Sequence, residues 1–218
     1  MVHLPFPTRK DAGAKLAESL TTYANTKDTL ILGLVRGGIV IGRALAEALH
    51  LPLYPYVVRK LGHPFHREFG LGAIAEGGET YLDEAMMKLQ GVSWDEMEPI
   101  IEEELGELKR RVEMYKVHPR PPLNGKTVIL TDDGAATGGT MFAAIQDMRK
   151  AKVKKVVVAL PVSPLDTAET FKKKADEVII LATPEPFEAV GKWYKDFQQV
   201  EDDEVVSLLQ SIEVPLVH

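Results

Sequence analysis

Short runs of apolar, often β-branched residues recur along the chain, and segments with the period of amphipathic helices separate them. Such runs are typical of strands buried on both faces, which occur in parallel sheets covered by helices. The five expected strands are Thr29–Val35, Leu53–Val58, Thr127–Thr131, Lys155–Leu160 and Glu177–Leu181. We therefore expect an α/β fold in which a parallel sheet carries helices on both faces.

Apolar residues at steps of three or four predict the helices. They are expected over Asp11–Tyr23, Gly38–Leu49, Trp94–Tyr115 and Thr140–Ala151. The third is the longest, and Ser93 with Glu96 forms a capping box before it. Pro99 and Gly106 argue against an unbroken helix there, because proline removes a backbone donor and glycine is a poor helix former.

One glycine-rich segment, from Lys60 to about Ala85, breaks the alternation of strands and helices. We expect irregular structure or short antiparallel strands there, forming a flap beside the sheet. With 218 residues, the chain has the length of one domain with an elaboration. We therefore expect a single domain over residues 1–218, in which residues 60–120 form a hood or flap insert and a proline-rich connector.

The amino-acid composition argues against several classes of protein. The 26 basic and 32 acidic residues give a net charge of −6, which argues against broad binding to nucleic acid. Cysteine is absent, so disulfides, thiolate metal sites and cysteine nucleophiles are excluded. No apolar run approaches the roughly 20 residues of a membrane helix, and Met1–Lys10 has no signal-peptide core. We expect a cytoplasmic protein without nucleic-acid or membrane partners.

Two consecutive acids, Asp132 and Asp133, follow the expected strand at Thr127–Thr131, and a glycine- and threonine-rich loop leads into the next helix. Open α/β sheets bind ligands at the carboxyl ends of their strands. The N-terminus of a helix attracts phosphate, and glycines let the backbone approach it. Carboxylates would repel phosphate but accept hydrogen bonds from sugar hydroxyls. The combination indicates a sugar phosphate.

Other interpretations of this loop fit its residues less well. Gly134 to Thr140 has the glycine spacing of a P-loop, but Thr140 stands where the lysine belongs. The glycine fingerprint of dinucleotide-binding folds is missing from both strand–helix turns, which argues against a Rossmann-type nucleotide-binding protein. The alternative without a binding function is a solvated turn that only caps the following helix.

A second candidate loop follows the first expected strand, where Arg36, Gly37 and Gly38 could bind an anion through backbone amides and a cationic side chain. Arg59 and Lys60 close the expected second strand and suit the same anion. His63 and His66 are spaced for a metal on a helix, but Pro64 between them makes a metal site there a weak candidate.

With these motifs in place, the chain resembles the type I phosphoribosyltransferases, whose fingerprint is a hydrophobic strand, two acids and a Thr-Gly-x-Thr loop. Here these are Val128–Leu130, Asp132, Asp133 and Thr137–Thr140. Nearly the whole chain is similar to a subgroup of predicted members with an unsettled acceptor. The further points of similarity are an N-terminal helix around Arg9–Leu20 and the runs Val57–Gly62, Gly72–Gly78 and Thr183–Phe197.

The resemblance implies transfer of 5-phosphoribose from phosphoribosyl pyrophosphate (PRPP) to a nucleobase-like acceptor, with Mg²⁺ bound through PRPP and helped by Asp132 and Asp133. It implies catalytic roles for these two acids and for Arg36, a place in nucleotide metabolism, and a homodimer. PRPP binding is expected at Ala135, Ala136, Thr137, Gly138, Gly139 and Thr140, and pyrophosphate binding at Arg36, Gly37, Gly38, Arg59 and Lys60. The pyrophosphate loop of the family often holds a cis peptide, which would here involve Val35, Arg36 or Gly37.

The acceptor is less well marked. Purine-specific members carry an acid where this chain has Ala136, so a purine mechanism of that kind is in doubt. Glu76, Phe187 and Trp193 are the candidates for the acceptor pocket, although aromatic clusters of this kind are more often core. The alternative function is a PRPP-sensing regulator that keeps the fold and transfers nothing.

Overall fold

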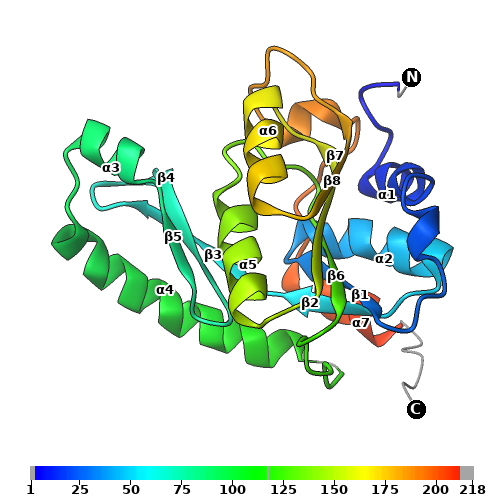
Figure 1. Cartoon of the computed structure of the whole chain (residues 1–218). Coiled ribbons are helices and arrows are strands. Elements are labelled where there is room, and N and C mark those ends of the chain that lie inside the picture. The colour runs from blue at the N-terminus through cyan, green and yellow to red at the C-terminus, as the bar shows by residue number, and fades with distance from the viewer. Residues whose placement is uncertain (1–2, 117, 212–218) are drawn as a thin grey trace.

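The computed structural model describes residues 3–116 and 118–211. Its centre is a parallel five-stranded sheet in the order β2-β1-β6-β7-β8 (Figure 1). The strands are β1 (Thr29–Leu34), β2 (Leu53–Tyr56), β6 (Thr127–Thr131), β7 (Lys155–Val162) and β8 (Glu177–Ala182). The expected α/β fold with a parallel sheet is therefore confirmed.

Each face of the sheet carries helices. Leu32, Leu130 and Val158 lie on the face that α5 (Gly139–Lys150) and α6 (Leu165–Lys174) cover. Ile31 and Ile129, one step along their strands, pack on the opposite side with α1 (Arg9–Ala17) and α2 (Gly37–Leu49). Because successive strand residues point to opposite faces, this two-sided burial explains why the strands are continuous apolar runs.

A separate three-stranded antiparallel sheet projects from one side of the molecule (Figure 1). It comprises β3 (Val58–His63), β4 (His66–Ala75) and β5 (Thr80–Leu82), and it continues into α3 (Glu84–Gln90) and α4 (Trp94–Tyr115). We call these elements the hood. The hood strands and α5 form part of one apolar cluster, in which the ring centres of Tyr81 and Phe142 lie 5.1 Å apart.

One expectation about this region was wrong. Arg59 and Lys60 do not close the second strand of the parallel sheet, because that strand ends at Tyr56 and both residues belong to β3. The apolar run continues without a break from one strand into the next, so periodicity alone did not reveal the change of sheet. The hood accordingly begins at Val58 rather than at residue 60.

The helix α4 runs unbroken over 22 residues through Pro99 and Gly106. The expected capping box is present, since Ser93 accepts from the Glu96 amide and the Glu96 side chain accepts from Ser93. The first helix is shorter than expected: it ends at Ala17, and a separate 3₁₀ turn, η1 (Thr21–Tyr23), follows.

The N-terminal segment pairs with a segment close to the end of the described chain. Phe6 forms a parallel bridge with Tyr194, next to the 3₁₀ turn η2 (Val190–Trp193). The Phe6 amide donates to the Trp193 carbonyl oxygen at 2.8 Å, and the Lys195 amide donates to the Phe6 carbonyl oxygen at 2.8 Å. The last described helix, α7 (Asp202–Gln210), packs on α2 and α4.

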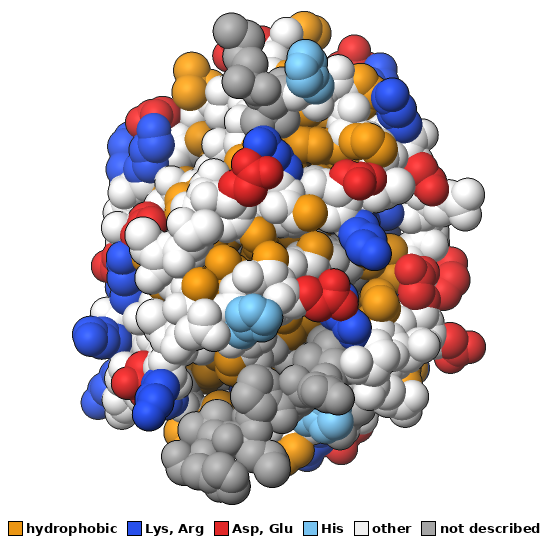
Figure 2. All heavy atoms as spheres, turned by 90° about the vertical axis from the view of Figure 1, so that its right-hand side faces the viewer, with side chains coloured by type: hydrophobic (Ala, Val, Ile, Leu, Met, Phe, Trp, Pro, Cys, Tyr) orange, Lys and Arg blue, Asp and Glu red, His pale blue; other side chains and the backbone are white. Residues whose placement is uncertain are grey.

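On the side that carries α1 and α2, Figure 2 shows cationic and anionic side chains interspersed around apolar ones. The described residues of this face therefore do not form the continuous basic surface that sequence-independent nucleic-acid binding requires. Among residues 3–116 and 118–211, no helix combines the length and the apolar character needed to cross a bilayer.

Candidate functional site

The candidate site lies at the carboxyl ends of β1 and β6, which pair side by side. Asp132 and Asp133 follow β6 directly. The amide of Asp133 donates to Asp132 Oδ1 at 2.9 Å, and the Tyr194 hydroxyl donates to the Asp133 carbonyl oxygen at 2.5 Å. These contacts fix the turn that carries both carboxylates.

The glycines of the first loop lie against this acidic turn. A methyl group on Gly38 would lie 2.5 Å from the Thr131 carbonyl oxygen, and one on Gly37 would lie 2.1 Å from Asp133 Oδ2. Contacts this short leave no room for a side chain. The two loops expected to bind the two ends of the same ligand are therefore neighbours. The Val35–Arg36 peptide is cis, within the three residues that the resemblance had named for such a bond.

The acid pair has an unusual electrostatic environment. Burial raises the pKa of Asp132 well above its usual range, and the neighbouring charge of Asp133 raises it further. Burial likewise raises the pKa of Asp133, although Arg9 and Lys60 oppose the shift. Raised values mean that the ionised carboxylates lack enough positive charge and hydrogen-bond donors. A ligand that brings hydroxyl donors or a cation would therefore bind here favourably.

The loop after the acids leads into the N-terminus of α5. Gly138 is the N-cap, with a φ of 77°, and no side chain caps this end. Within the part of the chain that the structure describes, the amides of residues 136–139 have no hydrogen-bond partner. Free amides at a helix N-terminus form a seat for an anion. The Ala135 amide differs, because it donates to the Val162 carbonyl oxygen at 3.1 Å.

Residues of α6 support this loop from behind. The Thr167 hydroxyl donates to the Ala136 carbonyl oxygen at 2.8 Å. A methyl group on Gly138 would lie 2.9 Å from both Phe171 and Thr167, so the loop rests directly on this helix. Thr137 is exposed and Thr140 is half-buried, and both remain accessible to a ligand.

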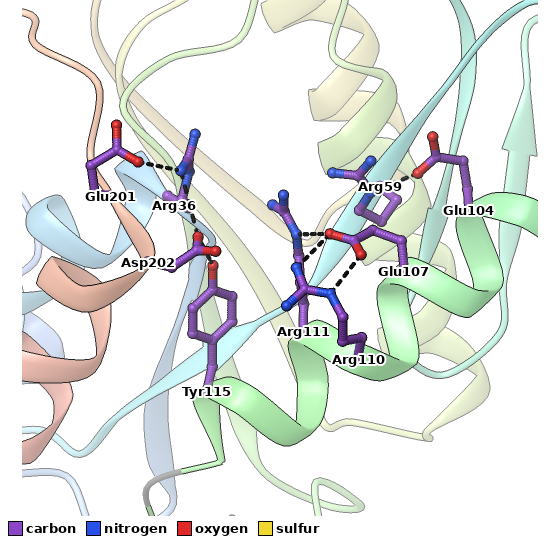
Figure 3. A network of polar contacts seen from close by, with 9 residues as sticks. All are labelled: Arg36, Arg59, Glu104, Glu107, Arg110, Arg111, Tyr115, Glu201 and Asp202. Atoms are coloured by element: carbon purple, nitrogen blue, oxygen red, sulfur yellow. Dashed lines mark hydrogen bonds and ion pairs between the residues drawn. The ribbon is translucent and has the colours of Figure 1, made fainter.

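The three candidate cations have different surroundings. The Arg36 side chain pairs with Glu201 at 3.3 Å and with Asp202 at 3.5 Å, and Asp202 also accepts from Tyr115 (Figure 3).

Arg59 pairs with Glu104 of α4 at 2.6 Å, so its side chain holds the hood together (Figure 3). Lys60, the next residue on the strand, is exposed and close enough to lower the pKa of both Asp132 and Asp133. Of these two neighbouring cations, Lys60 is the one that acts on the acid pair, while Arg59 is paired with Glu104.

The three acceptor-pocket candidates are not brought together. The Glu76 side chain, which directly follows β4 and is 10% exposed, pairs with Arg120 at 2.5 Å and accepts from the Val57 amide at 2.8 Å. Phe187 and Trp193 pack against the core beside α1 and α2, with ring centres 6.0 Å apart. The Glu76 side chain is thus engaged by a cation and a backbone donor, and its place in an acceptor pocket stays a prediction.

Arg9 is a site residue that the sequence did not reveal. Its Nε donates to Asp133 Oδ2 at 2.8 Å across 124 positions of sequence. A single arginine at the start of a helix carries no pattern, because its partner is fixed only by the tertiary fold. Apolar residues at helical spacing predicted a helix in this region, but such a pattern does not show what the first helical residue contacts.

Comparisons with known proteins agree with this geometry. Residues 4–204 match the family of the phosphoribosyl transferase domain. Two proteins of Mycobacterium tuberculosis strains, each named "Putative phosphoribosyl transferase", are 42% identical over 205 residues, or 94% of this chain. The chain spans 46% of the length of these curated relatives.

Solved structures show the same architecture. The crystal structure of TT1426 from Thermus thermophilus has a TM-score of 0.78 and 36% identity, covering 95% of this chain and 98% of that one. The AQ2163 protein from Aquifex aeolicus has a TM-score of 0.50 at 14% identity, with 79% and 73% covered, and shows the fold alone. The chain belongs to the phosphoribosyl transferase domain family.

Proposed function

We propose that this protein transfers 5-phosphoribose from PRPP to a nitrogenous base. The bond from the anomeric carbon of the ribose to pyrophosphate breaks, a bond from that carbon to a nitrogen of the base forms, and pyrophosphate leaves. The observation that carries the proposal is the adjacency of a half-buried acid pair, two crowded glycines and an uncapped helix N-terminus.

Each part of the site suits one part of PRPP. The amides of residues 136–139, with Thr137 and Thr140, suit the 5′-phosphate, because they offer donors at the positive end of α5. Asp132 and Asp133 suit the ribose hydroxyls. The backbone at Gly37 and Gly38 and the side chain of Lys60 suit the pyrophosphate, which carries the charge that leaves.

The family uses Mg²⁺ with PRPP, and the acid pair fits such an ion. No cluster of three or more metal-ligating side chains exists among residues 3–116 and 118–211. Mg²⁺ commonly binds through one or two carboxylates together with substrate oxygens and waters, so Asp132 and Asp133 would suffice. The ion would supply positive charge against the departing pyrophosphate.

The chain's own residues position the donor. Asp132 and Asp133 orient the ribose and stabilise positive charge that develops on its ring during transfer. Lys60 offsets charge on pyrophosphate from the hood side of the site. The backbone of Arg36 belongs to the proposed pyrophosphate loop, whereas its side chain forms ion pairs with Glu201 and Asp202. These carboxylates would have to release Arg36 before its guanidinium could bind pyrophosphate.

The experiment is an assay with PRPP, Mg²⁺ and a panel of purine, pyrimidine and other heteroaromatic bases, in which pyrophosphate release is followed. We expect base-dependent release with at least one acceptor, and none from an Asp132→Asn, Asp133→Asn double variant. PRPP binding without release from any acceptor would favour the second candidate function, a PRPP-sensing regulator. A wild-type protein that does not bind PRPP would refute both.

The expected homodimer also stays a proposal. Phe65 at the turn of the hood hairpin is 77% exposed and Leu89 in α3 is 74% exposed, so both could be buried by a second subunit. Light scattering of the purified protein would give its mass in solution, and a mass of about 24 kDa would contradict the homodimer.

A further inference from the structure

Arg9, the first residue of α1, contacts three separate parts of the candidate site. Its Nε donates to Asp133 Oδ2 at 2.8 Å, and its Nη1 donates to the Gln198 carbonyl oxygen at 2.8 Å. Its guanidinium carbon lies 3.8 Å from the centre of the Phe197 ring. A methyl group on Gly37 would come within 3.3 Å of Nε. One side chain thus joins the acid pair, the pyrophosphate loop and the segment before α7.

The contact with Asp133 is shielded from solvent. The side chains of Arg9 and Asp133 are only 11% and 16% exposed. Solvent and salt screen a pair this buried only weakly, and removing one partner leaves the other charge uncompensated. The Phe197 ring below the guanidinium adds a favourable cation–π contact that also fixes its plane. Arg9 is therefore held in one orientation.

That orientation determines how Asp133 faces a ligand. A guanidinium is a planar fork with donors in fixed directions, so a bond from Nε to Oδ2 restrains the rotation of the carboxylate. The main chain of Asp133 is fixed independently by Tyr194. The side chain and the main chain of Asp133 are thus held by two segments that lie far apart in sequence.

Arg9 also changes the charge that a phosphorylated ligand meets. Two adjacent carboxylates repel phosphate and pyrophosphate, and the nearby cations that offset this repulsion are Lys60 and Arg9. Lys60 is exposed to solvent, whereas Arg9 forms a direct ion pair. Arg9 therefore allows the acid pair to accept hydrogen bonds from a sugar without excluding its phosphates.

We propose that Arg9 is a positioning residue for the phosphoribosyl donor and that it acts through Asp133, whose carboxylate it orients and whose charge it offsets. The inference rests on the proposed function, since it assumes that the donor binds at the acid pair. It adds α1, which precedes the first strand, to the elements that build the donor site.

The test measures the dissociation constant of PRPP with Mg²⁺ by calorimetry for five variants of the full chain. These are Arg9→Gln, Arg9→Lys, Asp133→Asn, the double variant Arg9→Gln with Asp133→Asn, and Lys10→Gln as the control. Lys10 is the exposed neighbour of Arg9 in the same helix, so its substitution removes the same charge without touching the site. Thermal unfolding of each variant without ligand reports whether it folds.

We expect Arg9→Gln to weaken PRPP binding about tenfold, because a misoriented Asp133 carboxylate would lose one charge-assisted hydrogen bond to the donor. Arg9→Lys should restore part of the affinity, because lysine keeps the charge but lacks the fork. In the Asp133→Asn background, adding Arg9→Gln should weaken PRPP binding by less than about twofold further, because the effects of substitutions at coupled residues are not additive. Lys10→Gln should bind as the wild type does.

Three results would overturn the inference. Arg9→Gln could bind PRPP as tightly as Lys10→Gln does, or its loss could be undiminished in the Asp133→Asn background. Should Arg9→Gln not fold, wild-type affinity in a folded Arg9→Lys variant would overturn it instead. A wild-type protein that does not bind PRPP would refute the proposed function itself, which keeps the two failures distinguishable.

Discussion

The strands β1, β6 and β7 of the parallel sheet are buried almost along their whole length, whereas the first half of the hood strand β4 is exposed and β5 is only half-buried. The carboxyl ends of β1 and β6 carry the acid pair and the glycine loop. The hood contributes Lys60, an exposed cation, to the site. The proposed donor site thus lies at the ends of the most deeply buried strands, while the hood beside it presents more exposed strands.

The largest effect is expected at the sheet. Replacing Asp132 and Asp133 together by asparagine should abolish the rise in melting temperature that PRPP with Mg²⁺ produces, a stabilisation of about 2.7 kcal/mol at a hundredfold excess over the dissociation constant. The fold should persist, because burial already disfavours both charges. Thermal scans with and without ligand test this, and an unchanged ligand-induced shift would contradict it.

A matched pair of glycines compares the two regions directly. Gly38→Ala should lower the free energy of unfolding by about 1–3 kcal/mol, because its methyl group would overlap the Thr131 carbonyl oxygen at 2.5 Å. Gly70→Ala in β4 should change it by less than about 0.5 kcal/mol, since nothing lies within 4 Å of the added carbon. Urea unfolding measures both, and equal losses would remove the contrast.

The adjacent cations of β3 sharpen the comparison within the hood. Arg59→Gln should lower the free energy of unfolding by about 1 kcal/mol, because it breaks the part-buried pair with Glu104, and should leave pyrophosphate affinity unchanged. Lys60→Gln should weaken pyrophosphate binding and leave stability unchanged. Calorimetry with pyrophosphate and urea unfolding separate the two, and weaker pyrophosphate binding by Arg59→Gln would restore its sequence-based assignment.

Gly106 in the interior of α4 offers a stabilising change. No atom lies within 4 Å of a carbon added there. Alanine is the better helix former, so Gly106→Ala should raise the free energy of unfolding by about 0.5–1 kcal/mol. The midpoint of urea unfolding reports the gain. A loss of stability would show that α4 needs the flexibility of glycine at this point.

The smallest effect concerns pH. Arg110 and Arg111 lower the pKa of Glu107 on α4 from 4.5 to about 2 (Figure 3). Because the folded value is depressed, this contribution is present above about pH 4.5 and is lost as pH falls towards about 2. Solvent screening reduces it to a few tenths of a kcal/mol. Unfolding curves of wild type and Glu107→Gln should therefore differ less at pH 3 than at pH 6.

The difference in burial between the parallel sheet and the hood also determined which strands could be predicted from the sequence. Buried parallel strands are uniform apolar runs, so β6 was placed at Thr127–Thr131 as found, and the acids and glycines at the strand ends marked the site. The hood strands lack such uniformity. The continuous run from Leu53 hid the change of sheet after Tyr56, and so Arg59 was grouped with the site instead of with Glu104.

Long-range partners were also beyond the sequence. Glu76 had the residue type of an acceptor-pocket base, but its environment is set by Arg120 and by the Val57 amide. Arg9 had no distinguishing pattern, because its contacts come from residues 133, 197 and 198. Which residues meet across such separations depends on packing, and a single sequence does not encode it in any local period.

The bridge between Phe6 and Tyr194 has a consequence for biosynthesis. The ribosome releases α1 early, yet the partners that hold this end of the chain, Tyr194 and the Gln198 carbonyl, emerge only after all eight strands. All eight strands are therefore synthesised before the residues that contact Phe6 and Arg9. A chain that ends after β8 would have every strand of the sheet but would lack Tyr194, Phe197 and Gln198, and with them three contacts of the N-terminal segment.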